Sequence, residues 1–447
     1  MSKRCPGRDD TERRCQMTPG ARIQGSIEIL EGLLATDRPA DRFLTHWFRG
    51  RRYAGSKDRR AIREKLFFVL RHFHQLQWCC DEGASVRSLV LASLLLSEKQ
   101  SVSEITKQCD GVRYRPSPLT DAEIAMLSGL EGKSISDVIM PRSARYNLAD
   151  WLFEKAETSF GSKIDEELAV LATQAPLDLR VNVLKSDRGV VSEALASASI
   201  DTVPTRLSPI GLRIEAHQSL TQLDLFREGL IEVQDEGSQL VSLLCDAHPG
   251  MRVLDFCAGA GGKSLAIAAA MGNQGSITLC DLDMARLHQA KKRLARAGVT
   301  IGKTRLVARE NDPWIAGQAD AFDRVLLDAP CSGSGSWRRH PEARLRLTKV
   351  RFGEFCVLQR DLLLKAALLV RPGGRLIYAT CSIFKDENQG AVDDFLDQRS
   401  DYKALTIESV WQETLGESCP GKGSSLQLTP FRNATDGFFV GILERKN

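Results

Sequence analysis

The sequence lacks the long apolar segment that a membrane-spanning helix requires. Among its 447 residues, no run of about 18 uncharged apolar residues occurs. The first residues, MSKRCPGRDDTERRCQ, also lack the apolar core of a secretion signal. We therefore expect a cytoplasmic protein that does not span a membrane.

Paired cysteine motifs and clustered histidines are also absent. The 12 cysteines are scattered from Cys5 to Cys419 without a pair of CxxC elements, and the 7 histidines are dispersed. Scattered cysteines in a long chain fit free thiols in a reducing compartment better than a disulfide framework. The spacing does not fit a zinc site either, so we expect no metal.

The overall composition is that of a folded globular protein. Hydrophobic residues make up 43% and charged residues 26% of the chain, which excludes a disordered protein. The length is about three times a typical domain of roughly 150 residues, so two or three domains are expected.

Positive charge is concentrated near the amino terminus, although the net charge is only +4. Residues 1–75 contain 17 lysines and arginines against 9 acidic residues, and Arg49–Lys65 alone contains 8 basic and 2 acidic residues. Such a segment attracts a polyanion through salt-dependent contacts. A solvated helix face would have the same composition, and the sequence leaves both interpretations open.

Hydrophobic periodicity divides the chain into three parts. Residues 1–145 form a helical domain, because apolar residues recur at helical spacing from about residue 20 onward. Residues 146–233 begin with two helices and continue with strands over 177–185, 211–216 and 229–234, which predicts a small α+β module. In residues 234–447 strands and helices alternate, which predicts a parallel sheet covered by helices on both faces.

Polar or reactive residues follow four of the predicted strands in the third part. The first strand leads into a glycine-rich loop at 257–263, and the second ends at Asp281. The fourth is followed by Asp328 and Cys331, and the fifth by Cys381. Ligands of open parallel sheets bind beyond the carboxyl ends of the strands. We therefore expect these groups to meet in one site.

The glycine-rich loop has the features of a nucleoside-binding loop. Its glycines let the backbone approach a ligand at the start of a helix, where free N–H groups are available. Asp281 follows Gly259 by 22 residues, a spacing suited to a carboxylate that binds ribose hydroxyls. The loop predicted to contact the cofactor consists of Cys257, Ala258, Gly259, Ala260, Gly261, Gly262 and Lys263. This pattern alone does not separate a dinucleotide from S-adenosyl-L-methionine.

The two strand-end cysteines favour S-adenosyl-L-methionine. The C5 atom of a pyrimidine becomes nucleophilic when a thiolate adds to C6, and the C5 proton must leave before the thiolate is released. One thiol for attack and a second group for release fit these steps, and Cys331 and Cys381 are expected on neighbouring strands. Lys263 is placed to lower the pKa of a thiol, and Asp328 to hydrogen-bond the amidine edge of cytosine.

Three segments carry a family resemblance. DFCAGAGGKS, LLDAPCSGSG and YATCSIFKDENQG resemble the cofactor loop and the two cysteine motifs of the RsmB/NOP/Sun (Fmu) family of RNA 5-methylcytosine methyltransferases, in its bacterial 16S rRNA type. The segments RVNVLK, VQDEGSQL and TDGFFVGIL resemble further signatures of that family. The most specific element is the Thr-Cys-Ser motif at Cys381 with the downstream pair Glu387 and Asn388.

The resemblance implies both an architecture and residue roles. It implies a Rossmann-like class I methyltransferase domain, an all-α NusB-like N-terminal RNA-binding domain and a small α+β RNA-binding module. Cys381 matches the family nucleophile, and Cys331 matches the cysteine that assists product release. Asp281 matches the ribose carboxylate, and Asp328 matches a residue near both cofactor and base. The implied cofactor is S-adenosyl-L-methionine.

Two positions depart from the family pattern. The family usually has an aspartate after the third strand, where this chain reads LVARENDPW. Arg309, Glu310 and Asp312 are the candidates there, and we expect Glu310 to contact the cofactor. The loop at 258–261 also reads Ala-Gly-Ala-Gly where the family usually has Ala-Ala-Pro-Gly. This change loosens the turn but keeps the glycines that its geometry needs.

Four side chains are candidate RNA contacts. Arg180 and Asn182 lie in the segment RVNVLK, and Arg338 and Arg339 follow Trp337 beyond the Cys331 loop. An aromatic ring beside basic groups suits stacking and charge contacts with a single strand. The alternatives are exposed strand residues for the first pair and a surface loop around a partly buried tryptophan for the second.

The leading hypothesis is an S-adenosyl-L-methionine-dependent enzyme, expected as a monomer, that methylates C5 of a cytosine in RNA, with 16S rRNA preferred over transfer RNA. Enzymes that methylate DNA cytosine carry a Pro-Cys-Gln element, whereas Ser332 follows Cys331 here. A nicotinamide dehydrogenase leaves both strand-end cysteines unexplained. An RNA-binding ribosome assembly factor with weak catalysis is the remaining alternative, and the altered third-strand acid is its only support.

Overall fold

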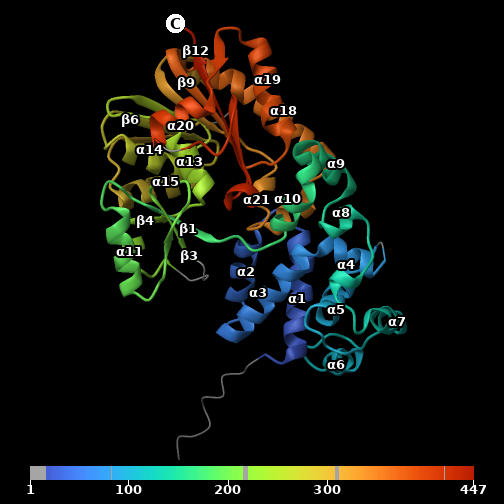
Figure 1. The fold of residues 1–447 in the computed structure, drawn as a ribbon. Helices are drawn as coiled ribbons and strands as arrows, with labels where there is room; N and C mark the ends of the chain where they lie inside the picture. The colour runs from blue at the N-terminus through green and yellow to red at the C-terminus, as the bar shows by residue number, and fades with distance from the viewer. Residues whose placement is uncertain (1–16, 82, 215–219, 308–311, 417) are drawn as a thin grey trace, which may run out of the picture. The chain divides into compact units, whose positions relative to one another are not determined.

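The computed structural model describes residues 17–81, 83–214, 220–307, 312–416 and 418–447, and it divides into two compact units (Figure 1). The helical unit extends to Glu154 and also contains His340–Arg346. The α/β unit comprises Lys155–Arg339 and Leu347–Asn447. The chain therefore passes between the units more than once.

The helical unit confirms the expected helical region, because its described residues contain helices and no strand. Its α-helices are α1 (Pro19–Leu34), α2 (Ala40–Arg49), α3 (Ser56–Arg71), α4 (Phe73–Cys79), α5 (Val86–Leu96), α6 (Val102–Gln108), α7 (Asp121–Leu130), α8 (Arg142–Arg145) and α17 (Pro341–Arg346), and α9 (Asp150–Phe160) begins in it. Serine and threonine side chains accept hydrogen bonds at the starts of α1, α5, α6 and α7, which stabilises these termini. Buried aliphatic side chains of α1, α3 and α5 form the core.

Helix α17 belongs to the helical unit, although the sequence placed its residues in the third part. Glu342 accepts a hydrogen bond of 3.0 Å from the backbone N–H at the start of α2. Arg344 donates to the last carbonyls of α3, and Arg346 donates to a carbonyl at the end of α1. An acidic group at a helix N-terminus and basic groups at C-termini complement the helix dipoles. Three polar side chains thus fasten α17 within this unit.

A small antiparallel sheet in the α/β unit confirms the expected α+β module. Its strands, in the order β2-β3-β1-β4, are β1 (Leu177–Val181), β2 (Val203–Pro204), β3 (Gly211–Ile214) and β4 (Ile231–Val233). β1 ends four residues earlier than predicted, because the chain turns after Asn182. Helix α11 (Arg188–Ser197) was not predicted. It begins where the Asp187 side chain accepts a hydrogen bond from the backbone N–H of Val190.

The large sheet contains the predicted parallel strands in the order β9-β8-β5-β6-β7. These are β5 (Arg252–Asp255), β6 (Ser276–Asp281), β7 (Gly302–Leu306), β8 (Phe322–Asp328) and β9 (Val370–Thr380). β12 (Phe438–Arg445) pairs antiparallel with β9, and β10 (Tyr402–Ala404) and β11 (Ser425–Leu428) pair antiparallel with β12. The order places β8 beside β9, as expected for the two cysteine-bearing strands.

Helices cover both faces of the large sheet (Figure 1). One face packs against α13 (Glu236–Leu243), α14 (Gly262–Ala270), α15 (Met284–Ala297) and α20 (Ile407–Leu415). The other packs against α18 (Lys349–Ala367) and α19 (Gln389–Gln398). Successive strand residues face opposite sides, so Ile377 lies in the first core and Leu376 and Tyr378 lie in the second. Apolar burial on both faces explains the nearly continuous apolar strands.

Candidate active site

The two cysteines predicted at the strand ends contact each other. Cys331 lies just beyond β8 and Cys381 directly after β9, and their Sγ atoms are 3.4 Å apart. The backbone N–H of Gly335 donates to the carbonyl of Cys381 at 2.9 Å, and Gly437 donates to the carbonyl of Gly335 at 2.9 Å. A Cβ atom on Gly335 would lie 2.0 Å from the Gly437 carbonyl oxygen. Glycine is therefore required where the two cysteine loops and the segment before β12 meet.

Lys263 and Asp328 form an ion pair at the same edge of the sheet. The Lys263 Nζ atom, in the first turn of α14, lies 2.6 Å from Oδ2 of Asp328 at the end of β8. Burial lowers the pKa of Lys263, but the charge and hydrogen bond of Asp328 and the charge of Cys381 outweigh it and raise that pKa above its usual value. Lys263 therefore stays an ammonium group.

Cys331 has the opposite electrostatic environment. Its hydrogen bond with Cys381, its burial and the charges of Cys381 and Glu387 raise the pKa of the Cys331 thiol well above the usual value. Cys331 therefore keeps its proton at neutral pH. The Glu387 carboxylate thus opposes a thiolate at Cys331.

The glycine-rich loop fits a nucleoside-containing cofactor. Gly261 caps α14 with φ +77°, in the left-handed region that favours glycine. The backbone N–H of Gly259 donates to Oδ2 of Asp281 at 2.8 Å, which orients a half-buried carboxylate beside the loop. A Cβ atom on Gly259 would have no neighbour within 4 Å. The described loop is thus open in front of free helix N–H groups, as a bound nucleoside requires.

Asp255, at the end of β5, is a buried carboxyl group to which the sequence assigned no role. Ser264 donates a hydrogen bond of 2.5 Å to its Oδ2 atom. Burial raises the pKa of Asp255 to about 7, and the charges of Asp328 and Asp281 add to this rise. The only sequence signal for the burial of Asp255 is its position at the end of a strand that helices cover on both faces.

The replacement for the third-strand aspartate falls partly outside the described residues. Arg309 and Glu310 lie there, so the expected cofactor contact of Glu310 stays a prediction. Asp312 is described, and its side chain accepts a hydrogen bond from the backbone N–H of Trp314 at 2.9 Å. It also pairs with Arg305 at 3.4 Å. Asp312 therefore begins α16 (Pro313–Ala316) in this structure.

Arg180 and Asn182 are buried, which corrects the RNA contacts expected of them. The Arg180 guanidinium donates to Oε1 of Gln234 at 2.5 Å and to the carbonyl of Gly262 at 2.6 Å. The amide of Asn182 donates to the carbonyls of Gly229 and Ala297. A buried polar group must be hydrogen-bonded within the protein. Arg180 thus connects the small sheet to the start of α14, and Asn182 connects it to the end of α15.

The segment Trp337–Arg339 also makes structural contacts. The burial of Arg338 corrects the RNA contact expected of it, whereas Arg339 is partly exposed and its RNA contact stays a prediction. Trp337 is buried against Phe384, with ring centroids 5.9 Å apart. Arg338 is buried and donates to the carbonyl of Thr435 and to Asp436. These contacts turn the side chains away from solvent and toward the segment TDGFF before β12.

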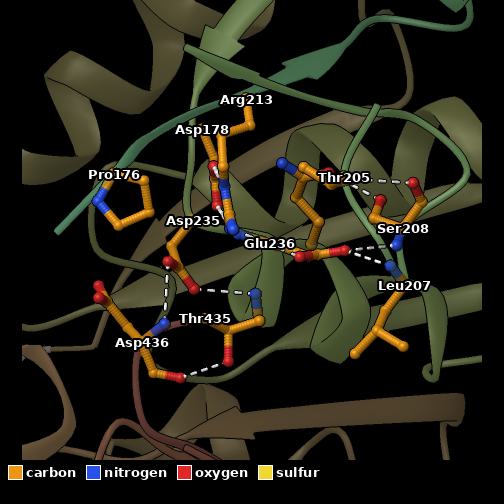
Figure 2. Close-up of polar contacts among 12 residues, drawn as sticks. Pro176, Asp178, Thr205, Leu207, Ser208, Arg213, Asp235, Glu236, Thr435 and Asp436 are labelled. Atoms are coloured by element: carbon orange, nitrogen blue, oxygen red, sulfur yellow. Dashed lines mark hydrogen bonds and ion pairs between the residues drawn. The ribbon is translucent and has the colours of Figure 1, made fainter. Parts of the chain in front are cut away.

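Arg339 connects three segments of the α/β unit. Its guanidinium donates to Oδ2 of Asp436 at 2.5 Å, to the carbonyl of Pro176 at 2.9 Å and to Oδ2 of Asp235 at 3.0 Å. Figure 2 shows Asp235 and Asp436 next to each other, near Pro176. Bidentate and charge-assisted bonds of this kind hold segments in fixed register. The resemblance at TDGFF thus reflects structural contacts.

A second buried network explains the segment VQDEGSQL. Arg213 on β3 donates to both carboxylate oxygens of Asp178 on β1, at 2.7 and 2.9 Å. Asp178 also accepts from the backbone N–H of Glu236, whose own carboxylate accepts from the backbone N–H groups of Leu207 and Ser208 (Figure 2). These bonds join the small sheet to the start of α13.

The basic segment at 49–65 forms a groove in the helical unit. The groove, here called the arginine groove, encloses about 630 Å³ and is lined by Leu44, Thr45, Phe48, Arg49, Arg52, Arg59, Arg60 and Arg63. All five arginines are exposed, and Arg59 lies over the Phe48 ring with 5.3 Å to its centroid. Lys65 is instead buried and pairs with Glu98. Most of the segment's charge therefore faces solvent.

Two further properties concern the described residues as a whole. No three or more histidine, cysteine, aspartate or glutamate side chains gather there in a group that could hold a metal ion. None of the helices in these ranges has the length and apolar character needed to cross a membrane.

Comparisons with known proteins agree with this geometry. A family model described as 16S rRNA methyltransferase RsmB/F matches residues 242–444, and a ferredoxin-like RsmF/B domain model matches 148–221. A probable ribosomal RNA small subunit methyltransferase B of Synechocystis sp. is 34% identical over 321 residues, 70% of this chain and 71% of that protein. The ribosomal RNA small subunit methyltransferase B of Shewanella oneidensis is 27% identical over 87% of this chain and 91% of its own.

Solved structures have the same architecture. The crystal structure of the protein PH0851 superposes with a TM-score of 0.78 and 27% identity, covering 96% of this chain and 99% of that one. A methyltransferase homolog protein from Pyrococcus horikoshii gives a TM-score of 0.57 and 26% identity over 68% of this chain and 97% of its own.

Proposed function

The chain belongs to the RsmB/F family of ribosomal RNA methyltransferases, and from this premise we propose that it methylates C5 of a cytosine in RNA, with 16S rRNA as the substrate. The observation that carries the proposal is the 3.4 Å contact between Cys331 and Cys381 beside the Lys263–Asp328 pair. Cytosine C5 methylation requires a nucleophile and a group that assists release, and this site supplies both as thiols.

The residues of the glycine-rich loop would hold S-adenosyl-L-methionine, the methyl donor of this family. When bound, this cofactor supplies an electrophilic methyl group. The free N–H groups at the start of α14 and the oriented carboxylate of Asp281 suit its amino acid and ribose parts. Gly259 leaves the space before the loop open for it.

The proposed chemistry begins and ends at Cys381. Its thiolate adds to C6 of cytosine, and the displaced π electrons make C5 nucleophilic. Asp328 hydrogen-bonds the amidine edge of the ring and stabilises the adduct. After C5 has gained its methyl group, the C5–H electrons re-form the C5–C6 double bond and the C6–S bond breaks. Cys331 accepts the C5 proton as its own proton passes to the departing Cys381 sulfur, so both end as thiols.

The arginine groove supports RNA as the substrate class. Its exposed guanidinium groups suit phosphate oxygens, and such contacts position nucleic acid without reading its sequence. The target base must also leave its stack to reach two thiols at the sheet edge, at a cost of roughly a few kcal/mol. Binding at a separate basic surface offsets that cost.

Paired cysteine variants test the proposal. Cys381→Ala should abolish methyl transfer, whereas Cys331→Ala should accumulate a covalent RNA–protein adduct, because attack proceeds and release does not. Cys419→Ala removes a half-buried cysteine outside the site and should leave turnover unchanged. Denaturing gel electrophoresis with labelled RNA detects the adduct. Absence of an adduct in Cys331→Ala would contradict the assigned roles.

Bisulfite sequencing of RNA from cells with and without the gene tests the substrate. A 16S rRNA cytosine that loses its protection would support the proposal in full. Loss of the signal in transfer RNA would support the proposed reaction but contradict 16S rRNA as the substrate. An unchanged pattern, together with RNA binding by the purified chain, would favour the assembly-factor alternative.

A further inference from the structure

Each of the two cysteines is followed by a serine, and both serines bind one carboxylate. The backbone N–H of Ser332 donates to Oε1 of Glu387 at 2.8 Å. The hydroxyl groups of Ser332 and Ser382 each donate to Oε2 of Glu387 at 2.5 Å. Glu387 thus holds the residue after Cys331 and the residue after Cys381 at the same time.

The carboxylate of Glu387 is fully buried, so it depends on these donors. Gln359 on α18 completes the set, donating to Oε1 of Glu387 at 3.1 Å and to the carbonyl of Pro330 at 2.9 Å. All of these donors are neutral groups. Removing donors from a buried charge is costly, so the two loops cannot separate without exposing or neutralising it.

The backbone around Glu387 is fixed independently of its carboxylate. The Tyr378 hydroxyl donates to the Glu387 carbonyl at 2.6 Å. The Asn388 amide donates to the carbonyl of Ser382 and to Gln427, and its oxygen accepts from Thr380. A change confined to the Glu387 carboxylate therefore leaves its segment anchored.

We propose that Glu387 is a positioning residue that keeps the two cysteine loops together and the two thiols in contact. The proposal rests on the proposed function, because only chemistry with two thiols needs this contact. The carboxylate also lies close enough for its charge to raise the pKa of Cys331. One side chain would therefore affect both the distance between the two sulfur atoms and the protonation of Cys331.

Glu387→Gln tests the proposal with little change in shape. The amide keeps one accepting oxygen, but its nitrogen donates and cannot accept from the serine hydroxyl groups. Asp386→Asn is the matched control, since it removes the adjacent carboxylate, which pairs with Lys155 at 2.5 Å and is partly exposed. Ser382→Ala is a second test that leaves the carboxylate in place.

Phenylarsine oxide measures the contact between the thiols without RNA, because trivalent arsenic binds two neighbouring thiols with loss of water. Protection of Cys331 and Cys381 from later alkylation is read peptide by peptide by mass spectrometry. Charge-assisted hydrogen bonds contribute about 1.5–3 kcal/mol, so Glu387→Gln should weaken this protection roughly 10- to 100-fold. Ser382→Ala should weaken it less, and Asp386→Asn should not change it.

The pH profile of iodoacetamide alkylation measures the protonation of Cys331. Glu387→Gln should move the Cys331 profile to lower pH, because the charge that opposes its thiolate is removed. Asp386→Asn should leave the profile in place. A merely structural role of Glu387 would not predict a shift toward lower pH.

The outcomes separate this proposal from the proposed function. Weaker bridging and a shifted profile in Glu387→Gln would support positioning, even if Cys331→Ala formed no RNA adduct and the proposed function failed. Unchanged bridging in both Glu387→Gln and Ser382→Ala would overturn the positioning role, even if the chain methylates RNA.

Discussion

Arginine side chains differ in burial and in their contacts between the α/β unit and the helical unit. In the α/β unit Arg180 and Arg338 are buried and Arg339 is partly buried, and each binds carboxylates, amide oxygens or carbonyls of its own unit. In the helical unit the arginines of the arginine groove are exposed around a cavity. A buried guanidinium needs hydrogen-bond or ion-pair partners within the protein. The arginines in the motifs beside the candidate site therefore stabilise the α/β unit. The arginine run without a motif is the one that faces solvent.

The largest loss of stability among the variants that test this comparison is expected for Arg339→Ala. Arg339→Ala leaves the buried carboxylates of Asp235 and Asp436 without their shared cation. Breaking a buried ion pair in this way destabilises a protein by about 3–5 kcal/mol. Hydrogen exchange at α13 and β12 measures the stability of this region separately from the helical unit.

The exposed Arg60 serves as the control for Arg339. Its side chain is 82% exposed and pairs with Glu64 on the same helix. Arg60→Ala should leave the free energy of unfolding nearly unchanged. An equally small loss for Arg339→Ala would break the comparison, because Arg339 would then be no more structural than a surface arginine.

Asp255 gives a pH-dependent test of buried charge in the α/β unit. Burial raises its folded-state pKa from 3.8 to about 7. The folded state then binds more protons than the unfolded state, so stability falls as pH rises between about 4 and 7, by at most roughly 1.4 kcal/mol per pH unit. Asp255→Asn removes this titration.

The measurement is the difference in unfolding free energy between the wild-type chain and Asp255→Asn across that pH range. The stability of the variant should increase relative to that of the wild-type chain as pH rises toward 7. The difference in unfolding free energy should become constant above pH 7. A difference independent of pH would mean that Asp255 titrates normally in the folded chain.

Much of the α/β unit could be predicted from the sequence because its signals are local. Apolar strands, a glycine loop and reactive residues at strand ends recur in the order that a covered parallel sheet requires. The neighbouring positions of Cys331 and Cys381 followed from that order and are confirmed. The helical region was equally clear from its periodicity.

What could not be predicted depends on partners distant in sequence. Arg339 binds residues 97 to 163 positions away, and nothing local distinguishes such an arginine from one that faces RNA. Helix α17 is short and rich in charged residues, and its sequence does not reveal its partners. In the structure Glu342 and Arg344 bind helix termini near the start of the chain. The role of Glu387 likewise required the meeting of two loops 50 residues apart.

Arg180 should show a smaller effect than Arg339. It joins β1 to the first turn of α14 through Gln234 and the carbonyl of Gly262. Hydrogen bonds to charged groups contribute about 1.5–3 kcal/mol, which is the loss expected for Arg180→Ala. Because Gly262 belongs to the glycine-rich loop that we propose holds S-adenosyl-L-methionine, affinity for that cofactor in calorimetry should fall as well. An unchanged affinity would restrict Arg180 to joining the small sheet to α14.

The smallest effect on stability, and the sharpest test of the helical unit, is expected in the arginine groove. The double variant Arg52→Ala and Arg60→Ala should leave the free energy of unfolding nearly unchanged, because both side chains are exposed. Two lost phosphate contacts should reduce the slope of log K against log salt by about 1.4 for single-stranded RNA. Lys303→Ala with Lys422→Ala, also exposed, is the matched control for charge. A localised binding site predicts that only the groove variant reduces the slope of log K against log salt. If both double variants reduced it equally, the net charge of the chain rather than the groove would attract the RNA.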